Sequence, residues 1–165
     1  MSGKVIGIFL LIVAVIGGAA MYWLQVYAFY ERVDDVALTV TQGGEARPLA
    51  ATGVQAIDAS SSPIRFRACF EVDGTLAGDP YPDATPLNAP GWFDCFDAAA
   101  IGDALASGAA QAYLGQFNVI YGIDRVIAVF PDGRAFAWHQ INACGEEVFD
   151  GRPAPEGCPP APAGE

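Results

Sequence analysis

The sequence predicts an α+β protein with one N-terminal transmembrane helix, followed by a small domain with a four- to five-stranded antiparallel sheet and one main helix. Three observations lead to this fold class. Residues 5–24 contain no charged side chain, an apolar stripe of helical spacing lies within residues 94–116, and two apolar strand patterns flank a turn within residues 123–141.

The apolar segment 5–24 has the length of a membrane span. Its sequence is VIGIFLLIVAVIGGAAMYWL, and at about 1.5 Å per residue such a helix covers roughly 30 Å, the thickness of the hydrocarbon core. A cleaved signal peptide, cut near Ala20, is the alternative. The apolar run continues past that point, and aromatic residues such as Tyr22 and Trp23 suit the membrane interface. We therefore favour a retained span in the lipid bilayer, with the helix continuing to residue 35.

Three regions follow: a membrane anchor over 1–30, an α+β domain over 31–150 and a proline-rich tail over 151–165, expected to be extended or disordered. Lys4 before the span and Arg32 after it are nearly balanced by the positive-inside rule. The free amino group and the cysteines favour an N-in orientation in a bacterial inner membrane, with the domain in the periplasm.

Alternating or apolar runs predict strands over residues 36–40, 54–58, 64–72, 123–130 and 134–141. The last two are joined by Pro131-Asp132-Gly133, in which proline presets φ and glycine takes the left-handed position. A three-residue loop places His139 opposite Arg125, whereas a two-residue loop places it opposite Val126.

The main helix is expected over 94–116, with Asp94 or Asp97 in its first turn, where a carboxylate accepts free backbone N–H groups. The preceding segment, 73–91, is rich in proline and glycine and predicts a long loop. Loops of this length are often functional. We expect Trp92 to attach its far end to the core.

The charge of the chain restricts its partners. The net charge is −11, and from residue 31 onward seven arginines stand against nineteen acidic residues. Nucleic-acid binding needs a basic surface that displaces counterions, so no nucleic acid is expected as a partner. The acidity serves solubility or, alternatively, docking onto a basic partner.

Four cysteines, at positions 69, 95, 144 and 158, indicate a disulfide framework in an exported domain. We favour the pairs Cys69–Cys95 and Cys144–Cys158. The first would clamp the long loop, and the second would attach the tail. A zinc site formed by cysteines and His139 is the alternative, but no C-x-x-C pair is present.

The candidate functional residues are Trp92, Asp94, Asp97, Trp138 and His139. The only histidine lies in a strand with no carboxylate directly opposite, and no nucleophile motif such as GxSxG accompanies it. A hydrogen-bonded structural histidine is therefore favoured, and no catalytic residue, metal or cofactor is assigned.

A calcium site around the long loop is a further alternative. Its carboxylates would come from Asp73, Asp79, Asp83, Asp94 and Asp97. The calcium-loop pattern D-x-[DN]-x-[DN]-G is absent, so these residues are interpreted as solvated loop residues and helix caps.

Three segments carry a resemblance to a known group of proteins: LQVYAFYE, WFDCFDAAAIGDAL and GIDRVIAVFPDGRAFAWHQINACGE. The chain resembles an uncharacterised family of short single-pass bacterial envelope proteins, some of which carry an automatic histidine kinase label. That resemblance implies no catalytic residues. A kinase needs an ATP-binding domain, which a chain of this length with one exported domain does not accommodate.

We therefore expect a membrane-anchored, non-enzymatic accessory, assembly or sensor-like protein with a partner in the envelope. The first alternative is an extracytoplasmic thiol-redox or metal-dependent enzyme that uses the cysteines and His139. The second is a small-molecule-binding module that uses the loop over residues 73–92.

Overall fold

The computed structural model describes residues 3–33, 35–74 and 76–162. The chain divides into two compact units, Met1–Tyr30 and Glu31–Glu165. The first contains α1 (Gly3–Trp23), which continues into a π-helical turn, η1 (Leu24–Ala28).

Among the described residues, Gly3–Ala28 is the one helix long and apolar enough to cross a membrane, a test that an N-terminal signal sequence also passes. The ring of Tyr27 stacks on Trp23, with 5.0 Å between the ring centroids. The predicted continuation of this helix to residue 35 is wrong. It ends at Ala28, because Glu31–Arg32 pairs with a strand of the second unit.

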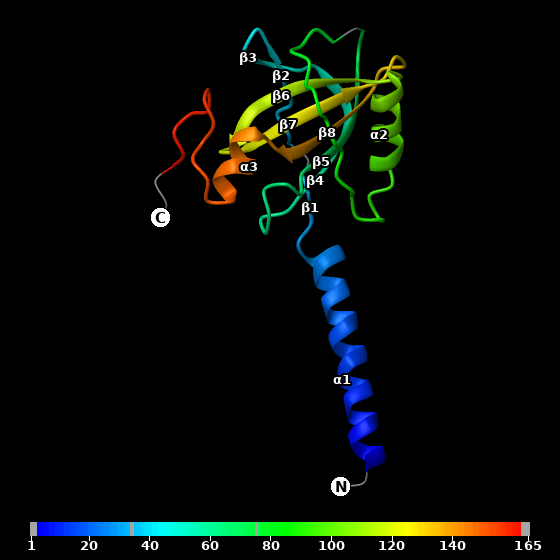
Figure 1. The fold of residues 1–165 in the computed structure, drawn as a ribbon. Helices are drawn as coiled ribbons and strands as arrows, with labels where there is room; N and C mark the ends of the chain where they lie inside the picture. Colours follow the sequence, from blue (N-terminus) through cyan, green and yellow to red (C-terminus); the bar gives the residue numbers. More distant parts are fainter. Residues whose placement is uncertain (1–2, 34, 75, 163–165) are drawn as a thin grey trace. The chain divides into compact units, whose positions relative to one another are not determined.

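The second unit contains β1 (Glu31–Arg32), β2 (Thr39–Gln42), β3 (Glu45–Pro48), β4 (Ala51–Asp58), β5 (Arg67–Val72), α2 (Ala98–Ser107), β6 (Gln111–Ile120), β7 (Ile123–Val129), β8 (Arg134–Ile141) and α3 (Ala143–Phe149) (Figure 1). Six strands form one antiparallel sheet in the order β1-β4-β5-β8-β7-β6, and β2 and β3 form a separate hairpin. The α+β class is confirmed, with more strands than the four or five predicted.

Strands β5, β8 and β7 form the centre of the sheet, and most of their residues are buried because both faces are covered. One face forms the main core, built around Phe66, Ala68, Phe70, Ile127 and Ala137. Leu38, just before β2, is part of this core, so the segment that leads into the small hairpin covers this face. The hydroxyl groups of Thr39 and Thr41 donate to the carbonyl of Gly115 in β6.

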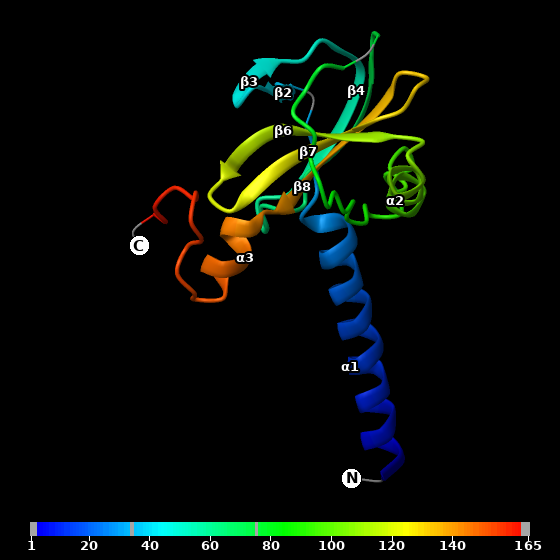
Figure 2. The ribbon, with the colours of Figure 1, turned by 45° about the horizontal axis from the view of Figure 1, so that its top comes forward.

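The other face is covered by the segment between β5 and β6, which includes α2, drawn green in Figures 1 and 2. The ring of Phe96 packs edge-on against Phe136 and Trp138 of β8. The Arg67 guanidinium, 3% exposed, donates hydrogen bonds to four backbone carbonyls. These belong to Ile64, Phe66, Leu87 and Asn88. The predicted long loop is therefore held to the sheet at its far end.

The predicted helix over 94–116 is too long. Helix α2 begins after Asp97, whose carboxylate accepts from the backbone N–H groups of Ala99 and Ala100. It ends at Gly108, which has a φ of 75° and so takes the left-handed conformation that stops a helix. The residues that follow form β6, because they pair with β7.

The β2–β3 hairpin replaces the strand predicted over 36–40, which overlaps β2 only in part. Its turn at Gly43-Gly44 is held by Asp79, whose two carboxylate oxygens each accept a backbone N–H bond of 2.8 Å. These bonds lower the pKa of Asp79 below its ordinary value.

Helix α3 is absent from the sequence expectations. Asn142 caps it by accepting from the N–H of Gly145. The predicted proline-rich tail follows, and its described residues form no helix or strand. Gly145 lies against the backbone of Gly122 in the β6–β7 turn, and a Cβ on Gly145 would collide with the Gly122 carbonyl and the Phe149 ring.

Gly145→Ala therefore tests the packing of α3 on the sheet. The added methyl group forces the helix away from the turn, so we expect the free energy of unfolding to fall by about 1–3 kcal/mol. Urea denaturation followed by tryptophan fluorescence measures this change. Gly91→Ala is the matched control, because no atom lies within 4 Å of a Cβ at that position. Equal stability of the two variants would contradict the close packing described for α3.

Candidate functional site

The two central candidates, Trp138 and His139, lie next to each other in β8 and therefore on opposite faces of the sheet. Trp138 is fully buried and packs against Phe96, and its Nε1–H donates to Oε1 of Gln140 at 3.2 Å. It is a core residue. His139 faces the other side, where it borders a cavity.

Trp92, Asp94 and Asp97 lie on the loop side of the sheet and serve local structure. Trp92 is half-buried, with the Arg32 guanidinium 5.7 Å from its ring centroid. Asp94 is exposed, and Asp97 caps α2. The five candidates do not converge on one site.

The carboxylates considered for calcium are similarly dispersed. Asp79 holds the Gly43-Gly44 turn, Asp97 caps α2, and Asp73 is exposed. Within the described part of the chain, no group of three or more histidine, cysteine, aspartate or glutamate side chains is placed to hold a metal ion.

The cysteines form the two disulfides that the sequence favours. Cys69 pairs with Cys95, which ties β5 to the segment before α2, and Cys144 pairs with Cys158, which ties α3 to the tail. All four thiols are thereby occupied.

His139 is held by hydrogen bonds at both ring nitrogens. Nδ1 lies 2.7 Å from the carbonyl oxygen of Pro63, and a carbonyl only accepts, so Nδ1 carries the proton. Nε2 lies 3.2 Å from Nε–H of Arg125, the residue directly opposite in β7, and accepts from it. The three-residue hairpin loop produces this register, and the imidazole is neutral.

Arg125 is itself tightly placed. Its guanidinium carbon lies 4.4 Å from the ring centroid of Phe66, and Nη1 donates to the carbonyl of Ala37 at 3.2 Å. The Phe66 ring also stacks on His139, with 4.7 Å between centroids. Burial, together with the nearby positive charge of Arg125, lowers the pKa of His139 to about 4, although the Pro63 hydrogen bond opposes this shift.

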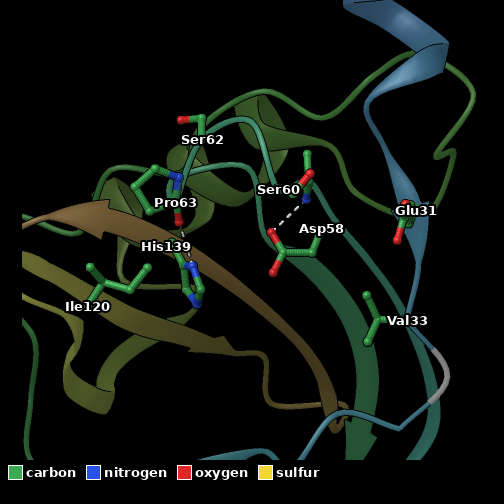
Figure 3. A pocket seen from close by; sticks show the side chains of 9 residues that line it. Glu31, Val33, Asp58, Ser60, Ser62, Pro63, Ile120 and His139 are labelled. Atoms are coloured by element: carbon green, nitrogen blue, oxygen red, sulfur yellow. Dashed lines mark hydrogen bonds between the residues drawn. The ribbon is translucent and has the colours of Figure 1, made fainter.

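The cavity beside His139 has a volume of about 460 Å³ (Figure 3). It is lined by Glu31, Val33, Asp58, Ala59, Ser60, Ser62, Pro63, Ile120 and His139. These residues come from β1 and the segment just after it, the end of β4, the turn after β4, the end of β6, and β8. In the view of Figure 3, the Asp58 carboxylate lies between the His139 ring and the pair Glu31 and Val33.

Asp58 is half-buried at the end of β4. Its Oδ1 accepts from the N–H of Ala59 at 2.8 Å. Burial raises the pKa of this carboxyl, whereas the Ala59 hydrogen bond and the charge of Arg125 act in the opposite direction. Burial is the largest of these effects, so the pKa of Asp58 lies above its ordinary value.

Serine, histidine and aspartate border the same cavity, a combination typical of nucleophilic catalysis. The geometry opposes that chemistry. A general base needs a free ring nitrogen near the hydroxyl, and the Nε2 lone pair of His139 is directed to Arg125. The cavity presents carboxylates, hydroxyl groups and apolar walls.

Asp58 and the 60–63 turn were not among the sequence-based candidates. The hairpin register could identify Arg125 as the neighbour of His139. Nothing local indicates that the 60–63 turn folds over His139, because Pro63 and His139 are 76 residues apart.

The comparison with protein families finds one match. The model described as "Family of unknown function (DUF6446)" matches residues 36–159. No curated protein and no solved structure matches the chain.

The buried neutral His139 makes stability dependent on pH. Its pKa is about 4 in the folded chain and 6.5 ordinarily, so between these values only the unfolded chain binds the proton. Stability therefore falls as the pH is lowered through this range, by roughly 3 kcal/mol in total. Urea denaturation at several pH values from about 7 to 4 measures the slope.

His139→Asn is the matched comparison, because its amide retains a donor near the Pro63 carbonyl but does not titrate. The difference in slope between the two chains isolates the histidine from all other groups. Parallel pH profiles of the chain and the variant would show that His139 is not held neutral.

Proposed function

Because the chain belongs to the DUF6446 family of unknown function, we propose its role from its geometry: a membrane-anchored extracytoplasmic module with a binding rather than a catalytic function. In a bacterial envelope, such a module acts as an accessory, assembly or sensor-like protein for a protein partner. The anchor is the Gly3–Ala28 helix.

The observation that carries this proposal is the pairing of all four cysteines. Disulfides persist in oxidising compartments and are rare in the cytosol. Each bridge attaches a segment that has little apolar surface of its own, the long loop in one case and the tail in the other. The domain thus depends on an environment where these bonds form, which supports a periplasmic location with the N-terminus inside.

The non-enzymatic part of the proposal rests on the engaged reactive groups. The thiols are in disulfides, and both nitrogens of His139 have partners. The acidity of the domain favours a partner with a basic surface, because complementary charges steer association.

Location is tested by protease treatment of spheroplasts that carry the full chain with a C-terminal tag. We expect the domain to be degraded without permeabilisation, while the chain stays in the membrane fraction after a carbonate wash. Thiol labelling under denaturing conditions should give no free thiol before reduction and four after it, matching the four cysteines. Protection from protease, or free thiols before reduction, would contradict the proposal.

The binding role is tested by purification of the tagged chain from its own membranes in mild detergent. We expect one envelope protein at a stoichiometric ratio, released by raised salt because opposite charges hold the complex. The matched control carries the same anchor and tag with the domain removed after residue 30. Recovery of the chain alone, or of the same proteins with the control, would oppose the proposal.

A further inference from the structure

Two carboxylates, those of Glu31 and Asp58, line the cavity beside His139. None of the ion pairs among the described residues involves Glu31 or Asp58. The charges of Arg125 and Arg67 favour the ionised form of Asp58. The Arg125 guanidinium nevertheless donates to His139 and to the Ala37 carbonyl, and it lies over the face of Phe66. It is not part of the cavity lining.

Asp58 is the deeper of the two carboxylates. Oδ1 accepts from Ala59, and Oδ2 has no hydrogen bond to any residue that the structure describes. Asp58 is half-buried and lines the cavity, so a donor that enters the cavity can reach this carboxylate. A donor with positive charge would complete this site, since charge-assisted hydrogen bonds are the stronger kind.

The rest of the lining is suited to an amphipathic group. Val33, Pro63 and Ile120 provide apolar walls, and Ile120 is 55% exposed despite its size. The turn after β4 adds the hydroxyl groups of Ser60 and Ser62. An aliphatic chain that ends in a cation has this combination of properties.

We propose that this cavity receives a lysine or arginine side chain from the protein partner. The aliphatic stem would lie against Val33 and Ile120, and the charged end would donate to Asp58 and Glu31. This inference rests on the proposed binding function and names the site and chemistry by which it operates.

A protein partner is favoured over a free amine by the position of the cavity. Glu31 of β1 and the nearby Val33, whose N–H donates to the Ala56 carbonyl of β4, belong to the edge of the sheet. Among the described residues, β4 is the one strand that pairs with β1. A partner segment can lie along this edge while one of its side chains enters the cavity. The excess of acidic over basic residues in the domain favours the same kind of segment.

The test uses the full chain in detergent micelles, labelled for amide NMR, and three capped amino acids. N-acetyl-lysine methylamide and N-acetyl-arginine methylamide carry the charge, and N-acetyl-norleucine methylamide has an aliphatic chain without it. We expect the charged probes to shift the amide signals of Ser60, Ser62 and Ile120, and norleucine to leave them unchanged. Equal shifts with all three, or none with any, would overturn the proposal.

Two substitutions test the carboxylates. Asp58→Asn and Glu31→Gln should each weaken binding of the lysine probe about tenfold or more, because each removes a charge-assisted hydrogen bond. Asp94→Asn and Glu156→Gln are the matched controls, since both residues are exposed and neither lines the cavity. The exposed Glu31 provides the test if Asp58→Asn fails to fold. Equal weakening by the controls would overturn the proposal.

Two further outcomes are informative. One distinguishes a side chain from a small amine as the source of the cation, and the other separates this inference from the proposed function. Methylammonium that binds as tightly as the capped lysine would overturn a side-chain occupant in favour of a small amine. A partner that still co-purifies at full yield with Asp58→Asn and Glu31→Gln would overturn this inference while leaving the proposed function intact. Failure to find any partner bears on the proposed function alone.

Discussion

The hydrogen bond from Arg125 to His139 is the interaction on which the chemistry of this domain depends. It joins the two central strands β7 and β8, holds the imidazole neutral, and leaves the guanidinium over Phe66 in the main core. Because Arg125 is used in this way, Asp58 at the cavity wall has no direct ion pair. This bond thus occupies the ring nitrogen that a general base would need.

An arginine has a similar structural role on the other face of the sheet. Arg67 is buried and donates to four backbone carbonyls, two of which belong to the long loop. The Cys69–Cys95 disulfide holds the same loop nearby. Polar groups and a covalent bond thus add to the apolar packing of Phe93 and Phe96 at the end of this loop. Both faces of the sheet are therefore covered by other parts of the domain, and the proposed binding site lies at its edge.

The sequence could predict those parts of the fold that depend on local signals such as turns. The Pro131-Asp132-Gly133 turn predicted the β7–β8 hairpin and limited the residue opposite His139 to Arg125 or Val126, of which the structure has Arg125. Both bridges were predicted from the loop and the tail that they would attach. The helix over 94–116 was too long because the left-handed Gly108 and the pairing of β6 outweighed an apolar helical pattern. The cavity could not be predicted, since β1, the turn after β4, and β8 meet only in the folded chain.

The most direct test of this account is the protonation state of His139, which is the only histidine and therefore gives an unambiguous signal. Long-range ¹H–¹⁵N NMR of the tag-free chain distinguishes a protonated ring nitrogen from a bare one. The account predicts a proton on Nδ1, a bare Nε2, and no titration until the pH approaches about 4. A proton on Nε2, or titration near pH 6.5, the ordinary histidine pKa, would contradict it.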